Sequence, residues 1–140
     1  MNHTNIRIEF KIYGDYIDID NVTKMMGVSP TVTYLKGDSI TNRPQTRKNA
    51  LWAIETDYEE SYSFDDALSE ILRAIADKAD VINKVKELYN VATSFTFVAN
   101  IHNGESPGLY LDKDFIKFAA EIGAWIQFPT YVFGDFDMEE

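Results

Sequence analysis

Residues 104–108 match the pattern Gly-x-Ser-x-Gly, which in many hydrolases presents a nucleophilic serine on a sharp turn between a strand and a helix. In those enzymes the helix begins directly after the serine, and the histidine that acts as the base lies later in the chain. Here Pro107 and Gly108 follow Ser106, and the chain contains no histidine beyond them. The pattern therefore predicts a turn-rich loop, and we assign no catalytic residue from it.

Histidine and cysteine, the usual zinc ligands, are scarce or absent, and the carboxylates lack the spacing of a calcium-binding loop. The chain has no cysteine and its two histidines lie far apart, so zinc sites built from these residues are not expected. A calcium loop beginning at Asp18 would need glycine at its sixth position and glutamate at its twelfth, where the sequence has Thr23 and Ser29. No glycine-rich phosphate-binding pattern is present. We therefore expect neither a metal nor a cofactor.

Basic side chains gather in a polar stretch between residues 36 and 49. Residues 1–50 carry seven basic and five acidic side chains, whereas residues 51–140 carry six and eighteen. Basic groups beside an aromatic ring can hold a phosphate or a carboxylate. One hypothesis is therefore a site for a small anionic ligand, formed by Lys36, Asp38, Arg43, Arg47 and Trp52. In the alternative interpretation the stretch is a solvated loop, and Trp52 belongs to the core of the next strand.

Acidic side chains dominate the segment from residue 57 to residue 66. The whole chain carries a net charge of −10 at pH 7, which opposes binding to the phosphate backbone of nucleic acids. An acidic surface instead speeds the approach of a basic protein partner. The candidate partner-binding residues are Asp57, Glu59, Glu60, Asp65 and Asp66. Alternatively, they form a solvated loop that leads into a helix, or the charge serves solubility alone.

The first half of the chain predicts three strands and one helix. Residues 6–13 alternate apolar and polar side chains, as in a strand with one buried face. A short helix from about Asp20 ends at Gly27, and a following proline prevents its continuation. Residues 32–35 and 50–56 are rich in strand-forming side chains and predict the second and third strands.

The second half of the chain predicts longer helices around a central strand. Ser63 and Asp66 have the spacing of a capping box, and apolar residues recur at helical spacing over residues 64–89. This segment is either one helix or two helices divided near residues 77–80. Residues 91–101 are rich in β-branched and aromatic side chains on both faces, as in a central strand.

A last helix and a last strand complete the predicted fold. Asp112 caps a helix that Gly123 ends, residues 125–133 form the final strand, and residues 134–140 form an acidic tail. The helix is expected to bury Phe115, Ile116, Ala119 and Ile122. Strands that alternate with helices of unequal length predict an α+β fold. We expect a mostly antiparallel sheet with helices packed on one face, ferredoxin-like in style.

Length and composition indicate a single domain. With 140 residues, of which 45% are hydrophobic and 26% charged, the chain has material for one packed core, which we place at about residues 6–133. The N-terminus lacks the basic and apolar regions of a signal peptide, and no apolar stretch is long enough to span a bilayer. We therefore expect a cytoplasmic protein without membrane association. The oligomeric state stays open.

Several short motifs, in their order along the chain, resemble a bacterial family catalogued as domain of unknown function 4279. In the first half they are Phe10-x-Ile12-x-Gly14-Asp15, residues 22–31 with Met26-Gly27-Val28-Ser29-Pro30-Thr31, Lys36-Gly37-Asp38 and Leu51-Trp52. In the second half they are Pro107-Gly108-Leu109-x-Leu111, Phe115-Ile116-x-x-Ala119 and Gly123-Ala124. The resemblance covers about residues 6–128. It implies no established activity, and it implies that residues 104–108 form a loop leading to the last helix.

Three functions from different classes follow from these observations. The leading hypothesis is a non-enzymatic interaction module, because the chain is small, lacks catalytic constellations and is strongly acidic in its second half. One form of it is a bacterial immunity protein, which some small domains of this kind resemble and which binds and neutralises a partner toxin. The alternative is a small anionic-ligand-binding domain that uses residues 36–52. The third and lowest-ranked function is an enzyme with paired carboxylates, which needs two carboxyl groups facing each other in a cleft.

Overall fold

The structure, a computed structural model, describes residues 2–134. Within them the chain forms one seven-stranded sheet and four helices, none of which is long and apolar enough to cross a membrane. The strands are β1 (Asn5–Gly14), β2 (Val32–Tyr34), β3 (Ala50–Glu55), β4 (Glu59–Glu60), β5 (Ala92–Ile101), β6 (Trp125–Gln127) and β7 (Thr130–Val132). The helices are α1 (Ile19–Met26), α2 (Asp65–Ile75), α3 (Ala79–Tyr89) and α4 (Lys113–Glu121). The predicted acidic tail lies, from residue 135 onward, outside the described residues.

Neighbouring strands in the sheet follow the order β2-β3-β1-β5-β6, while β4 pairs with the beginning of β1 and β7 pairs with the end of β5. The pairs β2/β3, β3/β1 and β1/β5 are antiparallel, and helices lie between β1 and β2 and between β3 and β5 in the chain. This order corresponds to the split β-α-β arrangement of ferredoxin-like folds. The predicted α+β class with a mostly antiparallel sheet is confirmed.

The last strand differs from its prediction. Instead of one strand over residues 125–133, the chain forms β6 and β7, which both pair in parallel with β5. The two are separated by Phe128 and Pro129, and a proline has no N–H group to donate to a strand ladder. The Pro129 carbonyl still accepts a hydrogen bond from the Ala99 N–H group at 3.0 Å. The parallel direction is possible because α4 carries the chain back along the sheet.

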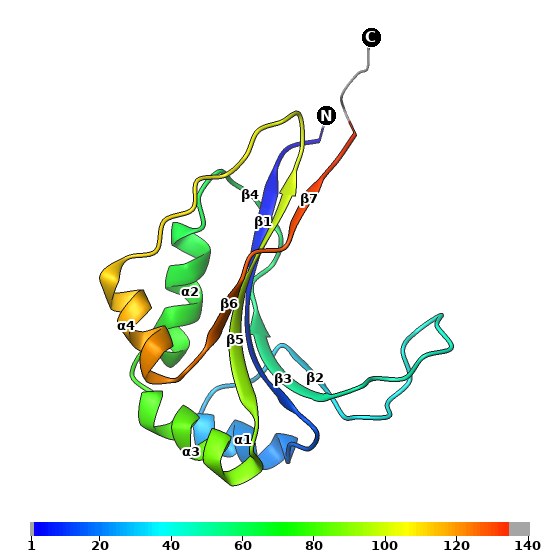
Figure 1. Ribbon diagram of the computed structural model, residues 1–140, viewed down its shortest axis with the longest axis vertical. Helices are drawn as coiled ribbons and strands as arrows, with labels where there is room; N and C mark the ends of the chain where they lie inside the picture. The colour runs from blue at the N-terminus through cyan, green and yellow to red at the C-terminus, as the bar shows by residue number, and fades with distance from the viewer. Residues whose placement is uncertain (1, 135–140) are drawn as a thin grey trace.

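The two faces of the sheet are covered differently (Figure 1). The even-numbered residues of β1 from Ile6 to Ile12 are buried in the core, together with apolar residues of α2 and α4. The odd-numbered residues from Arg7 to Tyr13 lie on the opposite face, over which no helix of residues 2–134 packs. We call this surface the helix-free face. The helices α1 and α3 pack against each other at the end of the sheet where β1 ends and β5 begins.

Local capping explains where α1 begins and ends. The Asp18 carboxylate accepts a hydrogen bond from the Asn21 N–H group at 3.1 Å, which satisfies a backbone donor of the first turn. Gly27 follows the helix with a φ of 69°, a left-handed conformation that glycine adopts without steric cost. Both ends of α1 therefore lie within two residues of the prediction.

The helix α4 begins as predicted but buries a different set of side chains. The Asp112 carboxylate accepts from the Phe115 N–H group at 2.8 Å. The prediction that Ile116 is buried is wrong, because it is 49% exposed and Phe118 is buried in its place. Residues three or four apart share a helix face, so Phe118 joins Phe115 in the core while Ile116 points away.

The long helical segment is divided into α2 and α3 by residues 76–78. The predicted capping box of Ser63 and Asp66 is wrong, because Phe64 occupies the N-cap position of α2 and makes no side-chain cap. The Phe64 ring packs edge-on against Phe97, with the ring centroids 5.4 Å apart. The Ser63 hydroxyl accepts a hydrogen bond from the Asp65 N–H group at 3.2 Å, so this bond and the buried ring contact both lie at the beginning of the helix.

Candidate functional site

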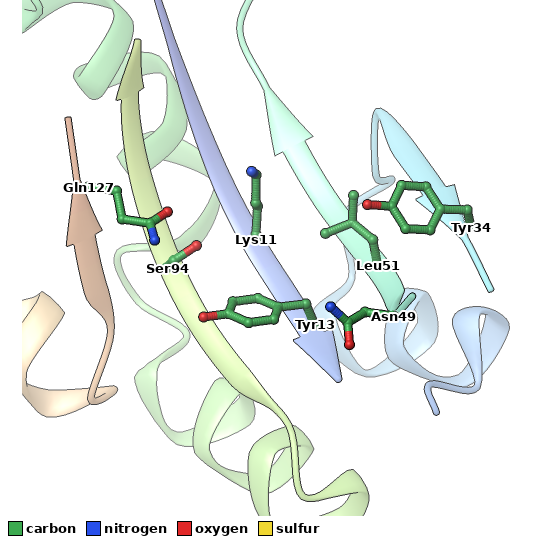
Figure 2. A pocket seen from close by; sticks show the side chains of 7 residues that line it. All are labelled: Lys11, Tyr13, Tyr34, Asn49, Leu51, Ser94 and Gln127. Carbon is green, nitrogen blue, oxygen red and sulfur yellow. The ribbon is translucent and has the colours of Figure 1, made fainter. Parts of the chain in front are cut away.

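A hollow of about 220 Å³ opens on the helix-free face (Figure 2). Its lining comes from five strands and from the residue before β3: Lys11, Tyr13, Tyr34, Asn49, Leu51, Ser94 and Gln127. In this view the helices lie behind the sheet, so the hollow faces away from the apolar core. It is therefore a surface site supported by the strands of the sheet.

The register of the strands explains why this surface is hollow. Across the strands, one row is Tyr34, Leu51 and Tyr13, and the next row is Ala53, Lys11 and Ser94. Ala53 and Ser94 are small, so they leave space beside the two tyrosine rings. Residues directly opposite each other on one face have Cβ atoms roughly 5 Å apart, which brings the side chains of both rows within reach of one small molecule.

The Ser94 hydroxyl is a buried polar group without a hydrogen-bond partner. Ser94 is 1% exposed, and its side chain lines the hollow (Figure 2). No donor or acceptor among residues 2–134 bonds to its Oγ atom, whereas the hydroxyl of the adjacent Thr93 donates to the Ile122 carbonyl at 3.3 Å. The large majority of buried polar side chains are hydrogen-bonded. The Ser94 hydroxyl is therefore available to a partner from outside the described chain.

Other polar groups around the hollow are available to a ligand. The hydroxyls of Tyr13 and Tyr34 and the side-chain amide of Asn49 make no hydrogen bond to any described part of the chain. The Gln127 Oε1 atom accepts from the Thr96 hydroxyl at 3.3 Å, which leaves the NH₂ group of Gln127 free to donate. The hollow thus presents hydroxyl and amide groups.

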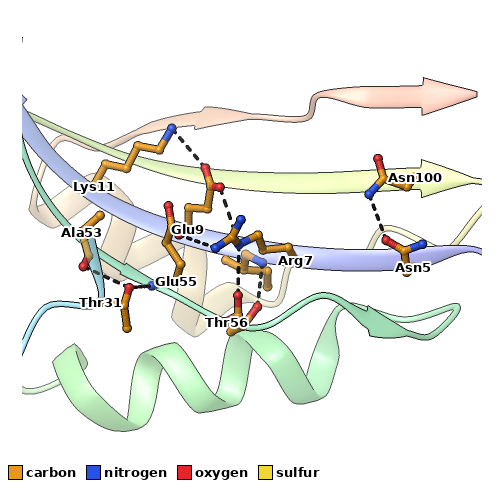
Figure 3. A network of polar contacts seen from close by, with 10 residues as sticks. Asn5, Arg7, Glu9, Lys11, Thr31, Ala53, Glu55, Thr56 and Asn100 are labelled. Atoms are coloured by element: carbon orange, nitrogen blue, oxygen red, sulfur yellow. Dashed lines mark hydrogen bonds and ion pairs between the residues drawn. The ribbon is translucent and has the colours of Figure 1, made fainter. Parts of the chain in front are cut away.

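A row of alternating charges lies beside the hollow (Figure 3). Arg7 forms an ion pair with Glu55 through its Nη2 atom, and its Nε atom lies 3.8 Å from Glu9. The Lys11 Nζ atom lies 3.1 Å from the other oxygen of Glu9. Glu9 and Glu55 are directly opposite each other in β1 and β3, and their side chains are 13% and 11% exposed. The two carboxylates are therefore held between two cations, and the four formal charges cancel.

The two carboxylates share the charge of one arginine. Burial raises the pKa of the Glu55 carboxyl above its ordinary value of 4.5; Arg7 opposes this shift and the charge of Glu9 reinforces it. Burial alone would lower the pKa of the Arg7 guanidinium, but a hydrogen bond with Tyr58 and the charges of Glu55 and Glu9 together raise it. Glu9 and Glu55 face each other, as the carboxylate-enzyme hypothesis requires, but neither lines the hollow.

None of the five candidate ligand-binding residues lines the hollow, and two of them have partners elsewhere. Trp52 is fully buried on the helix-covered face, where its Nε1–H group donates to the Thr23 hydroxyl at 3.0 Å. The interpretation of Trp52 as a core residue is therefore confirmed. The Lys36 Nζ atom lies 3.3 Å from the Asp15 carboxylate, and both side chains are exposed. An exposed pair of this kind contributes little to stability.

The other three candidates lie in the loop between β2 and β3. The Asp38 carboxylate accepts from the Leu35 N–H group at 2.8 Å and so shapes its own turn. Arg43 is exposed. The Arg47 guanidinium lies 4.1 Å from the centroid of the Tyr34 ring, and Tyr34 lines the hollow. Arg47 is thus the candidate residue that contacts the lining of the hollow. Tyr34 and Asn49, at the two ends of the loop, both belong to that lining.

All five candidate partner-binding residues are exposed on the segment that runs from the end of β3 through β4 to the first turn of α2. They are Asp57, Glu59, Glu60, Asp65 and Asp66, and we call residues 57–66 the acidic segment. Tyr58 and Tyr62 lie among them, and each is half exposed. The Tyr62 hydroxyl donates to the Glu105 carboxylate at 3.1 Å, a bond that raises the pKa of Tyr62.

The serine motif is a loop, as predicted. Asn103 and Gly104 have φ values of 57° and 69°, which is typical of tight turns. Ser106 is exposed, and its hydroxyl donates to the Pro107 carbonyl at 3.4 Å.

Within residues 2–134 no three His, Asp or Glu side chains are grouped so that they could hold a metal ion.

Most of the hollow was missed by the reasoning from sequence. The alternation over residues 6–13 places Lys11 and Tyr13 on one polar face. No local pattern, however, shows that Ser94 lies beside Lys11 or that Gln127 lies two strands away, because these positions depend on long-range strand pairing. Ser94 shares β5 with three other polar residues, Thr93, Thr96 and Asn100, so no local signal singles it out.

The fold and the site together define an α+β sheet domain with one helix-covered face and one helix-free face that carries a polar hollow. The chain belongs to the family described as Domain of unknown function (DUF4279), whose model matches residues 4–133. The resemblance noted from the sequence motifs is thereby confirmed. Comparison with the curated proteins and with the solved structures gives no match.

Proposed function

We propose that this protein is a non-enzymatic binding module that holds a small polar ligand in the hollow of its helix-free face. The observation that carries the proposal is the Ser94 hydroxyl, which is buried beside the hollow and has no hydrogen-bond partner in the described chain. An unpaired buried hydroxyl costs about 1–3 kcal/mol. A polar ligand that reaches Ser94 would offset this cost and would gain binding energy from it.

Features of the surrounding surface support the same conclusion. Ligand sites combine an apolar floor with a few well-placed polar groups, and here Leu51 lies among hydroxyl and amide side chains. The ligand-binding function expected for residues 36–52 is kept in a modified form. Tyr34 and Asn49 flank that loop and line the hollow, and Arg47 lies over Tyr34.

The proposal is tested by a thermal-shift screen of the purified protein against a library of small polar metabolites. A ligand present at about 100 times its Kd should add about 2.7 kcal/mol to the free energy of unfolding. Ser94→Ala should reduce the shift, whereas Ser69→Ala, at an exposed position on α2, should leave it unchanged. No shift with any compound, or equal shifts for both variants, would contradict the proposal.

A second candidate function is the capture of a basic protein partner by the acidic segment. In this proposal the protein acts as an immunity protein that neutralises a toxin in a bacterial cytoplasm. It is supported by the exposure of all five carboxylates around the half-exposed rings of Tyr58 and Tyr62. Carboxylates steer a basic partner, and tyrosine rings supply contact area at protein interfaces.

The second function is tested by affinity purification from the native cells with two matched double variants. Asp65→Asn with Asp66→Asn removes two charges from the acidic segment and should abolish recovery of the partner. Asp80→Asn with Glu87→Gln removes two exposed charges from α3 and should not. Recovery of no stoichiometric partner, or of the same amount with both double variants, would count against this function.

A further inference from the structure

We infer that the ligand of the hollow is a neutral, hydroxyl-rich ring, such as a single sugar or a cyclic polyol. This inference rests on the proposed function and names the chemical class of the ligand. It depends on three properties of the hollow: its charge, the hydrogen-bonding capacity of its polar groups, and its apolar surface (Figure 2).

The charges around the hollow are already balanced. Lys11 is the cation in its lining, and its Nζ atom lies 3.1 Å from Glu9. Arg7 is engaged with Glu55 and Glu9 on the far side of the same row (Figure 3). An anionic ligand would compete with Glu9 for Lys11, and it would also approach two partly buried carboxylates, which repel it. The hollow therefore favours a ligand without a formal charge.

The hydrogen-bonding groups of the hollow match hydroxyl groups. The hydroxyls of Tyr13, Tyr34 and Ser94 can each both donate and accept, and the side-chain amide of Asn49 can do the same through its two ends. The NH₂ group of Gln127 adds donors. A ligand hydroxyl also both donates and accepts, so several of them on one ring satisfy these groups in pairs. A ligand with acceptors alone would leave part of this capacity unused.

The hollow has apolar side chains in its lining and a volume sufficient for one ring. In Figure 2 the rings of Tyr13 and Tyr34 lie across the sheet face, with Leu51 between their strands. The C–H groups of a saturated ring pack against aromatic faces and aliphatic side chains through dispersion contacts. A cavity of about 150 Å³ accommodates a benzene ring, so a hollow of about 220 Å³ has room for one substituted six-membered ring.

Tryptophan fluorescence and side-chain amide resonances report directly on this site. Trp125 is paired in register with Ser94 and is 67% exposed, whereas Trp52 is fully buried on the other side of the sheet. The side-chain NH₂ groups of Asn49 and Gln127 line the hollow. We would titrate the protein with glucose, galactose, ribose and myo-inositol as neutral probes, and with inorganic phosphate and acetate as anionic probes.

At least one neutral probe should cause saturable changes in Trp125 fluorescence and in the Asn49 and Gln127 resonances. Its Kd should stay constant between about 50 and about 500 mM NaCl, because salt screens interactions between charges only. Ser94→Ala should weaken binding about tenfold through loss of one hydrogen bond in a buried site. Tyr34→Phe should also weaken it, whereas Tyr110→Phe, at an exposed position in the loop before α4, should not.

The outcomes separate failure of this inference from failure of the proposed function. Saturable binding of phosphate or acetate at the same resonances, with a Kd that rises with salt, would overturn the inference and leave a ligand site in place. The same holds if no probe binds but the metabolite screen finds a charged or ring-free ligand whose thermal shift depends on Ser94. If neither the probes nor the screen yields a ligand, both the inference and the proposed function fail.

Discussion

The helix-covered and helix-free faces of the sheet bury their side chains by different means. On the helix-covered face, Phe10, Phe95 and Phe115 pack ring against ring beneath the helices, and the buried Thr93 hydroxyl has a partner within the chain. On the helix-free face, ion pairs and small side chains take the place of packing, and the Ser94 hydroxyl has no partner in the described chain. The helix-covered face is completed by its own residues, whereas the helix-free face keeps a buried hydroxyl without a partner in the described chain, which supports the proposed binding.

The largest expected effect is the loss of a ring from the helix-covered face. Phe95 is fully buried and contacts the rings of Phe10, Phe115 and Phe118. Phe95→Ala should lower the free energy of unfolding by about 3–5 kcal/mol, measured by urea denaturation. Tyr13→Ala, on the helix-free face, should cost less than half as much. Equal losses of unfolding free energy in the two variants would contradict the claim that only the helix-covered face depends on ring packing.

A smaller effect is expected from breaking the charge row. Arg7→Met removes the cation shared by Glu9 and Glu55 and leaves two partly buried carboxylates facing each other. The free energy of unfolding should fall by about 2 kcal/mol, between the values for exposed and for fully buried pairs. The exposed pair of Lys36 and Asp15 is the control, and Lys36→Met should change stability by less than about 0.5 kcal/mol. A similar loss of stability in both variants would show that the ion pairs of Arg7 contribute no more than an exposed pair.

The two neighbouring hydroxyls of β5 should respond to removal with opposite signs. Thr93→Val replaces a hydrogen-bonded hydroxyl and leaves the Ile122 carbonyl without that donor, so stability should fall by about 1 kcal/mol. Ser94→Ala removes an unpaired buried hydroxyl, so the ligand-free protein should be equally stable or more stable by up to about 1 kcal/mol. Thermal unfolding of both variants measures the difference. A clear loss of stability in Ser94→Ala would mean that the hydroxyl has a partner in the folded chain.

The smallest effect is a dependence on pH that comes from Glu55. Its pKa is raised above 4.5 in the folded protein, so the folded state holds this proton more tightly than the unfolded state does. The resulting stabilisation is present at low pH and is lost as pH rises from about 4.5 through the raised pKa. The free energy of unfolding of the wild type minus that of Glu55→Gln should therefore fall over this range and then level off. A difference that rises with pH would mean that Arg7 lowers the pKa of Glu55 below its ordinary value.

Elements with local causes could be predicted from the sequence, and elements with long-range causes could not. The alternation in β1, the glycine that ends α1 and the capping of α4 by Asp112 are properties of a few adjacent residues. The burial of Phe64 at the beginning of α2 involves Phe97, which is distant in the chain. The parallel pairing of the last two strands depends on β5, which is distant in the chain.

The candidate site was predicted less well than the fold for the same reason. The basic residues around Trp52 are close in sequence, but Trp52 points into the core while Tyr34 and Leu51 face the hollow. Adjacent residues of a strand point to opposite faces, so a cluster of residues in the sequence is divided between two surfaces. The hollow instead gathers residues from five strands, and only the register of the sheet brings them together.

The most direct test of the central claim is to map where a bound ligand contacts the protein. Backbone and side-chain amide shifts would be recorded while the protein is titrated with the strongest compound from the metabolite screen. The perturbed residues should be those of the helix-free face, with the largest shifts at Lys11, Tyr34, Ser94 and Gln127. Shifts confined to the acidic segment or to the helices would contradict the assignment of the hollow as the binding site.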